Sequence, residues 1–205
     1  MLIPTFAEIV SMAEAGFVVI DVPIGLSDED RTCDRLARER LGERHVCVFT
    51  PPSRSALVAE TQEEASRLNA IACGRGVSAQ AFGIFKKISE VDAAMTKALQ
   101  EHVFEAHPEV TFAELAKTDG GLEAGKDTPE GQHVRLALLR PFFELRETIA
   151  EARTRLGGRE LVNPDDVVDA LGCLATAIRL DRGSAALFPP TLEVDSRNLR
   201  MQIVA

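Results

Sequence analysis

The hydrophobic positions along the chain follow two different spacings. In several stretches the apolar residues recur every three or four positions, which predicts amphipathic helices. Shorter runs, rich in β-branched and aromatic residues, lie between these stretches and predict strands. The predicted helices cover residues 5–15, 28–44, 55–72, 78–100, 133–156 and 167–180, and the predicted strands cover residues 17–20, 45–49, 102–106 and 199–204.

This alternation of strands and helices indicates the fold class. Strands that alternate with helices favour an α/β protein over an all-helical bundle, and here the helices are longer than the strands. The first strand, residues 17–20, is apolar throughout, which is typical of a buried parallel strand. Residues 118–132 are rich in Gly, Asp, Lys and Thr and predict a solvent-exposed loop. A chain of 205 residues is long enough for one large domain, and we expect a single domain over residues 1–205.

The charge balance narrows the classes of function. The 32 acidic and 23 basic side chains give a formal net charge of −9. Such a field repels nucleic acid and anionic membranes, so any nucleic-acid site must be local. The chain has no Trp and no Tyr, which argues against RNA-recognition and OB-fold surfaces that stack bases on aromatic rings.

The remaining composition predicts a compartment. The four cysteines occur singly, without a Cys-x-x-Cys pair, and indicate reduced thiols rather than a zinc site. The first residues lack the pattern of a secretory leader, and no apolar run reaches the roughly 18 residues needed to span a bilayer. We therefore expect a cytoplasmic protein with no membrane segment.

Acidic side chains lie at the ends of two predicted strands. Asp21 follows the first strand directly, and either Glu105 or Glu109 ends the strand over residues 102–106. Ligands of α/β proteins bind at the carboxyl ends of parallel strands, although an Asp before Val-Pro is also a common turn residue. His107 shares a strand face with Glu105 and is either a proton shuttle or ligand, or a hydrogen-bonded structural residue.

A third group of acids opens the last predicted helix. Asn163 and Pro164 form a helix start, and Asp165 and Asp166 in the first turn are explained by the helix dipole alone. Asp169 lies in an otherwise apolar helix face, which this capping role does not explain. Carboxylate oxygens are the ligands that Mg²⁺ and Mn²⁺ prefer, so these acids together predict a divalent-metal site.

Several basic residues are candidates for binding an anion. Arg31, Asp34 and Arg38 follow each other at helical spacing, which suits either a ladder of ion pairs or a phosphate site. Lys87 and Lys126 either contact an anionic ligand or face solvent.

The segment Gly-Arg-Gly-Val-Ser at residues 74–78 superficially looks like a phosphate loop. It lacks the spacing and the Gly-Lys-Ser or Gly-Lys-Thr ending of that motif. The simpler interpretation is a backbone turn in which Ser78 caps the following helix.

Several motifs, in this order, resemble domain-of-unknown-function family 429. They include Asp-Val-Pro-Ile-Gly after the first strand and Glu-x-His-Pro-Glu-Val after the later one, and they extend across nearly the whole chain. The matching segments are residues 20–26, 31–38, 48–52, 86–92, 105–110, 126–131 with Arg135, 165–170 and 199–203.

This resemblance implies a ribonuclease H-like fold and a predicted nuclease, that is, metal-dependent cleavage of phosphodiesters in a nucleic acid or nucleotide. Mapped by motif, Asp21, Glu105 and Asp169 become the expected catalytic residues, with Mg²⁺ or Mn²⁺ as the cofactor. The expected metal ligands are Asp21, Glu105, Asp165, Asp166 and Asp169. The expected substrate-binding residues are Arg31, Asp34, Arg38, Lys87, His107, Lys126 and Arg135.

One segment departs from the family pattern. Family members usually begin with a Gly-Val-Asp-Gly-like strand and two further strands, which these 205 residues lack. We therefore expect a ribonuclease H-like fold that is incomplete at the N-terminus, helix-rich, with a small mixed sheet. The missing Asp makes a non-catalytic ligand-binding or assembly module on the same fold the alternative function. The missing strands also leave residues 17–20 with an open edge, which predicts a homodimer.

Overall fold

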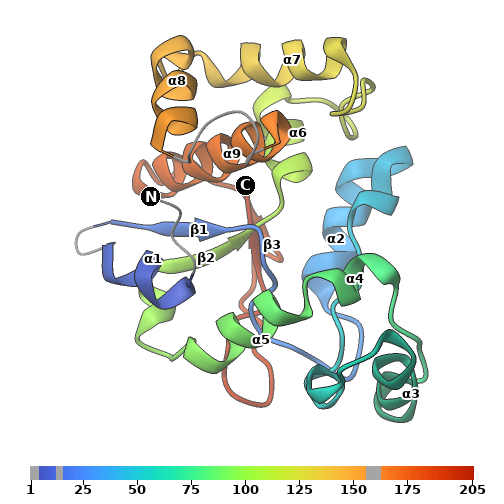
Figure 1. The fold of residues 1–205 in the computed structure, drawn as a ribbon. Helices are drawn as coiled ribbons and strands as arrows, with labels where there is room; N and C mark the ends of the chain where they lie inside the picture. Colours follow the sequence, from blue (N-terminus) through green and yellow to red (C-terminus); the bar gives the residue numbers. More distant parts are fainter. Residues whose placement is uncertain (1–4, 13–15, 156–162) are drawn as a thin grey trace.

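A small mixed sheet lies at the centre of the molecule (Figure 1). The computed structural model describes residues 5–12, 16–155 and 163–205, and within them the strands form one four-stranded sheet in the order β1-β2-β4-β3. β1 and β2 are parallel, with Ile20 opposite Glu105; β2 and β4 are parallel, and β3 is antiparallel to β4. The predicted α/β class and the parallel first strand are therefore confirmed. The strands are β1 (Val18–Ile20), β2 (Val103–Ala106), β3 (Leu187–Phe188) and β4 (Ile203–Val204).

Helices surround this sheet and make up most of the regular structure. Residues 13–15 of the first predicted helix, and residue 156 at the end of another, lie outside the described residues. None of the described helices is long and apolar enough to cross a membrane. The α-helices are α1 (Phe6–Met12), α2 (Thr32–Leu41), α3 (Gln62–Cys73), α4 (Ala79–Gly83), α5 (Phe85–Ala94), α6 (Pro108–Ala116), α7 (Pro129–Leu139), α8 (Leu145–Arg155) and α9 (Pro164–Asp181), and the 3-10 helices are η1 (Gly42–Cys47), η2 (Arg54–Val58) and η3 (Leu99–Glu101).

The two faces of the sheet are covered by different helices. On one face α9 crosses the strands, and its Cys173 packs with Ala106 and Val204. α6 and α7 pack against α9 (Figure 1). On the other face α1 and α5 contribute Phe6 and Val91 to a separate cluster with the strand residues. This covering of both faces explains why β1 and β2 consist largely of apolar residues rather than an alternating pattern.

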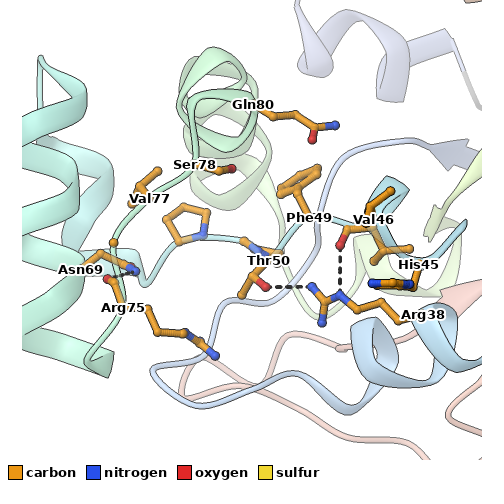
Figure 2. A pocket seen from close by; sticks show the side chains of 14 residues that line it. Arg38, His45, Val46, Phe49, Thr50, Asn69, Arg75, Val77, Ser78 and Gln80 are labelled. Carbon is orange, nitrogen blue, oxygen red and sulfur yellow. Dashed lines mark hydrogen bonds between the residues drawn. The ribbon is translucent and has the colours of Figure 1, made fainter. Parts of the chain in front are cut away.

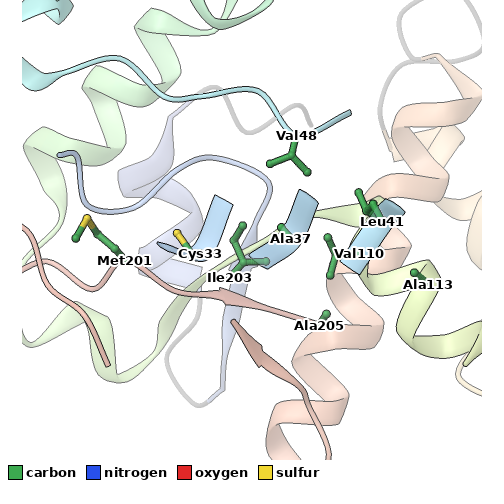
Figure 3. Packing of buried hydrophobic residues seen from close by; sticks show 9 residues of the cluster. All are labelled: Cys33, Ala37, Leu41, Val48, Val110, Ala113, Met201, Ile203 and Ala205. Carbon is green, nitrogen blue, oxygen red and sulfur yellow. The ribbon is translucent and has the colours of Figure 1, made fainter. Parts of the chain in front are cut away.

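Helix α2 packs on the sheet through a single stripe (Figure 3). Cys33, Ala37 and Leu41 are spaced four residues apart, so they share one face of the helix, and all three are buried. They contact Val110 of α6 and Ile203 of β4 within one cluster. Full burial of a side chain such as Leu41 stabilises the fold by about 1.5–3 kcal/mol. The cluster holds α2 along its length against α6 and β4.

The predicted strand over residues 45–49 is wrong. Residues Gly42–Cys47 form the 3-10 helix η1, and the chain then runs extended without joining the sheet. Val46 is 72% exposed, whereas Val48 is 5% exposed and packs in the α2 cluster. The alternating residues suit a strand, but strand propensity depends on a neighbouring strand to pair with, and none is adjacent in the described sheet.

Two helix starts lie where the sequence predicted a strand end and a loop. α6 begins at Pro108 and α7 at Pro129, each with the proline in the first turn. Thr128 caps α7 by accepting a hydrogen bond from the backbone N–H of Gly131 at 3.0 Å. Proline suits the first helical turn because its missing N–H has no intrahelical partner there. The predicted helices over 55–72, 78–100 and 133–156 are each broken into shorter elements.

Candidate functional site

A pocket of about 180 Å³ lies at the carboxyl ends of the two parallel strands. Asp21 directly follows β1 and His107 directly follows β2, so the strand register brings these two side chains to one edge of the sheet. Asp169 from α9 and Lys126 from the segment before α7 complete this edge. We call this site the carboxylate pocket. Its lining residues are Asp21, Arg44, Cys47, Phe49, Gln80, His107, Pro108, Glu109, Lys126 and Asp169.

Asp169 reaches the pocket because α9 packs against β1. The side chain of Asp169 is 17% exposed, and its Oδ2 accepts a hydrogen bond from Lys126 Nζ at 2.9 Å. Burial raises the pKa of Asp169, and the ammonium group of Lys126 opposes this shift. The negative charge of Asp169 is therefore only partly compensated by the protein.

Asp21 lies beside Asp169 in the same pocket. It is accessible to solvent through the pocket mouth, although protein atoms surround its carboxylate closely. Loss of hydration raises the pKa of Asp21 above its ordinary value. Asp169 raises that pKa further, whereas His107 and Lys126 lower it. Two neighbouring carboxylates thus repel each other in a place where an added cation would stabilise both.

His107 is held by the chain around it. Its Nε2 lies 3.1 Å from the carbonyl oxygen of Cys47, and because a carbonyl only accepts, Nε2 carries the hydrogen. Nδ1 is buried and has no hydrogen-bond partner among the described residues. In the neutral ring, Nδ1 therefore keeps a free lone pair.

Glu109 lines the pocket and is held by Arg135, which lies outside the lining residues. Arg135 Nη2 donates to both carboxylate oxygens of Glu109, at 2.7 and 2.8 Å, and both side chains are almost completely buried. Arg44 Nε lies 3.9 Å from the same carboxylate. Arg135, expected to bind substrate, instead joins α7 to α6 through its pair with Glu109, and its Nη1 donates to the Gly131 carbonyl of its own helix at 3.0 Å.

Glu105 faces α2 rather than the carboxylate pocket. Its Oε2 accepts hydrogen bonds from Arg31 Nη2 at 2.5 Å and from the backbone N–H of Ile24 at 2.8 Å. Arg31 Nη1 also lies 3.8 Å from Asp34 Oδ1, so two buried carboxylates share one guanidinium. Burial raises the pKa of Glu105 to about 7. Glu105 and Asp21 both border a small cavity of about 20 Å³, but Glu105 is already held in a structural ion pair.

The remaining expected site residues lie elsewhere. Asp165 accepts a hydrogen bond from Gln132 Nε2 at 2.7 Å, and Asp166 is exposed in the first turn of α9. Neither lines the carboxylate pocket. Lys87 is 59% exposed on α5 and lies 3.7 Å from a carboxylate of its own helix. Arg38 lines a second pocket, which is described below.

The donor set of the carboxylate pocket fits a hard divalent ion that takes only some of its ligands from the protein. Among the described residues, no group of three or more His, Cys, Asp or Glu side chains is arranged to hold a metal. Asp21 and Asp169 supply two carboxylates only. Mg²⁺ is commonly bound in this way, by one or two carboxylates together with waters and substrate phosphate oxygens.

Phe49 and Gln80 are site residues that the sequence did not indicate. The sequence pattern predicts Phe49 at the end of a strand and Gln80 near the start of a long helix. Both line the carboxylate pocket because residues 48–53 run extended past it and α4 begins beside it. The paired prolines after Thr50 were a signal that this segment is not a central strand.

Comparisons with known proteins identify a family but no characterised relative. Residues 2–194 match a family model described as a protein of unknown function (DUF429). Neither the curated proteins nor the solved structures contain a match.

Proposed function

The chain belongs to the DUF429 family, whose function is unknown, and we propose that it is a divalent-metal-dependent phosphoester hydrolase of the nuclease type. The observation that carries this proposal is the meeting of Asp21 and Asp169 with Lys126 in one pocket. The two carboxylates suit a hard cation, and the ammonium group suits an anionic substrate. Mg²⁺ and Mn²⁺ are the proposed ions.

Hydrolysis of a phosphoester adds one water molecule across a P–O bond. The water oxygen bonds to phosphorus, the bond to the leaving oxygen breaks, and that oxygen takes up a proton. A bound Mg²⁺ or Mn²⁺ supplies positive charge to the phosphate in such reactions. Asp21 and Asp169 would hold the ion, and Lys126 would orient a phosphate oxygen beside it. The hydrogen bond from His107 Nε2 to the Cys47 carbonyl would hold these two lining residues together.

A ribonuclease H-like fold is part of this proposal. Two features support it: the parallel strand β1 ends at an acid, Asp21, and a late helix packs on the sheet and brings a second acid, Asp169, to the same edge. The motif order that resembles domain-of-unknown-function family 429 implies the same fold.

A second candidate is a non-catalytic module that binds an anionic ligand. The ion pair between Lys126 and Asp169 favours it, since Lys126 already compensates one of the two carboxylates without a metal. The two candidates differ in whether Mn²⁺ binds at the carboxylates.

Calorimetric titration with Mn²⁺ tests the proposal. Asp21→Asn and Asp169→Asn each remove one charge while nearly keeping the side-chain shape. Loss of one charged ligand costs about 1.5–3 kcal/mol, so Mn²⁺ affinity should fall by roughly 10- to 150-fold. Asp166→Asn is the matched control, because Asp166 lies on the same helix outside the pocket.

Hydrolysis of bis(4-nitrophenyl) phosphate gives the second readout. We expect Mn²⁺-dependent turnover that EDTA abolishes and that both pocket variants lose. Mn²⁺ affinities equal in the pocket variants and in Asp166→Asn would refute the metal site. Binding of Mn²⁺ without any turnover would leave the ligand-binding module as the better account.

A further inference from the structure

A second pocket, of about 380 Å³, opens beside the carboxylate pocket (Figure 2). Its volume lies in the range of small-molecule sites, roughly 300–1,000 Å³. Its walls combine apolar side chains with an equal share of polar and charged ones, which suits a ligand that has both a ring and a charged group. We call it the arginine pocket. Its lining residues are Arg38, His45, Val46, Val48, Phe49, Thr50, Pro51, Pro52, Asn69, Arg75, Gly76, Val77, Ser78 and Gln80.

Arg38 is held in position by hydrogen bonds to neutral groups. Its Nε donates to the carbonyl oxygen of Val48 at 3.0 Å, and its Nη2 donates to Thr50 Oγ1 at 2.7 Å. Within the part of the chain that the structure describes, no carboxylate forms an ion pair with Arg38. Asp34, four residues away on α2, interacts with Arg38 only at longer range. A fixed guanidinium without a close carboxylate is able to bind an anion.

The other arginines of this helix region differ in this respect. Arg31 is paired with Glu105, Arg35 with Glu39, and Arg40 with Glu114. Of the predicted ladder of Arg31, Asp34 and Arg38, the first two lie 3.8 Å apart, whereas Arg38 lines a cavity and forms no ion pair among the described residues.

Arg75 enters the same pocket from the opposite side. Figure 2 shows its guanidinium and that of Arg38 pointing into the pocket from different segments. The buried side chain of Asn69 fixes the backbone here, because its Nδ2 donates to the Arg75 carbonyl at 2.8 Å and its Oδ1 accepts from Ser53 N–H at 2.7 Å. Arg75 also pairs with Asp30, whose side chain is 73% exposed and therefore easily rehydrated.

An aromatic ring lies between the two arginines and the polar end of α4. Figure 2 shows Phe49 beside Ser78 and Gln80, with Thr50 next to it. The face of a phenyl ring stacks on planar heterocycles, and stacking does not depend on the base. The exposed amide of Gln80 can both donate and accept hydrogen bonds at the edge of such a ring.

The two pockets are adjacent, because Phe49 and Gln80 line both. We propose that the arginine pocket binds a nucleotide, with its base on Phe49 and a phosphate between Arg38 and Arg75. The ligand is a mononucleotide or a very short oligonucleotide, since the net charge of −9 opposes a long polyanion. This inference rests on the proposed function and deepens it, because it names the substrate class. In a short oligonucleotide held this way, the next phosphodiester would lie toward the carboxylate pocket.

Calorimetry with adenosine 5′-monophosphate in EDTA tests the inference without any metal. Adenosine and inorganic phosphate, titrated separately, report the contributions of ring and charge. Arg75→Gln and Arg38→Gln should each weaken binding of the monophosphate by about tenfold or more, and Phe49→Leu should weaken adenosine and the monophosphate alike. Arg35→Gln is the matched control, because Arg35 lies on α2 with Arg38 but is exposed and outside the pocket.

Thermal unfolding followed by circular dichroism checks that each variant folds. Arg38→Gln removes a hydrogen bond to the Val48 carbonyl, so Arg75→Gln, whose side chain supports no buried backbone, keeps the test valid if Arg38→Gln unfolds. Equal monophosphate affinity in Arg75→Gln and Arg35→Gln would overturn the inference. So would equal affinity for adenosine and the monophosphate, or at least tenfold tighter binding of a six-nucleotide single strand, which would assign the site to a polymer.

The outcome is independent of the metal proposal. Asp21→Asn should retain monophosphate binding in EDTA while it loses Mn²⁺ affinity. If Mn²⁺ binds at Asp21 but the monophosphate does not bind at all, the nucleotide inference fails and the proposed hydrolase stands. If the monophosphate binds through Arg75 but Mn²⁺ does not bind, the hydrolase fails and a nucleotide-binding module remains.

Discussion

The buried ion pair between Arg135 and Glu109 should be essential for stability. Its side chains are 1% and 6% exposed, and one guanidinium nitrogen donates to both carboxylate oxygens. The other terminal nitrogen donates to the carbonyls of Ala124 and Gly131, at 3.1 and 3.0 Å. Arg135 therefore ties α6, α7 and the segment that carries Lys126 into one unit.

Arg135→Met tests this role. Methionine keeps most of the aliphatic volume beside Phe112 but removes the charge and the hydrogen bonds. The carboxylate of Glu109 is then left buried, with only Arg44 Nε nearby at 3.9 Å. Breaking a buried pair from one side costs about 3–5 kcal/mol, and we expect a loss of that size in the free energy of unfolding.

The double variant Arg135→Met/Glu109→Gln separates the ion pair from simple packing. It removes the unpaired charge, so it should be more stable than Arg135→Met by about 1–3 kcal/mol. Arg35→Met, at an exposed pair with Glu39, should change stability by about 0–1 kcal/mol. Urea unfolding must be followed by circular dichroism, because the chain has no Trp or Tyr for fluorescence. A loss below about 1 kcal/mol for Arg135→Met, with no gain from the second substitution, would refute the reasoning.

Two further predictions concern Glu105 and the edge strand β1. Because burial raises the pKa of Glu105 from 4.5 to about 7, the folded state binds a proton that the unfolded state has lost between these values. The free energy of unfolding contributed by this group therefore falls as the pH rises through that window, and Glu105→Gln should flatten the slope in urea titrations at several pH values. β1 pairs with a strand on one side only among the described residues, so self-association through its open edge stays a prediction; light scattering at micromolar concentration should give the mass of a dimer, and the mass of a monomer would contradict it.

The sequence predicted those parts of the fold whose local signals agree with their surroundings. The spacing over residues 28–44 predicts a helix stripe of Cys33, Leu36, Ala37, Arg40 and Leu41. Cys33, Ala37 and Leu41 are buried, whereas Arg40 forms an ion pair with Glu114. Asn163 before a proline predicted the start of α9, and its side chain accepts a hydrogen bond from the backbone N–H of Asp165 at 3.3 Å. The same signal occurs at Thr128 before Pro129, where the polar composition of the surrounding segment concealed a helix start.

The candidate site was only partly predictable for a different reason. The positions of Asp21 and His107 at strand ends follow from the chain itself, because parallel strands end at one edge. The partners of buried charges depend on tertiary contacts between distant segments. Arg31 and Glu105 are 74 residues apart, and no local pattern indicates that they pair. Spacing alone therefore could not distinguish acids that face the pocket from acids held in structural ion pairs.

A substitution of Lys126 should affect metal binding and catalysis in opposite directions. It competes with a metal for Asp169, to which it donates at 2.9 Å, and at 49% exposure of its side chain this ion pair contributes about 0–1 kcal/mol. Lys126→Met should therefore raise the Mn²⁺ affinity by up to roughly fivefold, measured by calorimetry. The same variant should lower the turnover of bis(4-nitrophenyl) phosphate, because the substrate oxygen loses its ammonium partner. Lys117→Met is the control, because Lys117 also precedes α7 in the chain but does not line the pocket. If Lys126 only supports the structure, Lys126→Met lowers both the Mn²⁺ affinity and the turnover. A higher Mn²⁺ affinity together with a lower turnover is the result expected if Lys126 contacts the substrate.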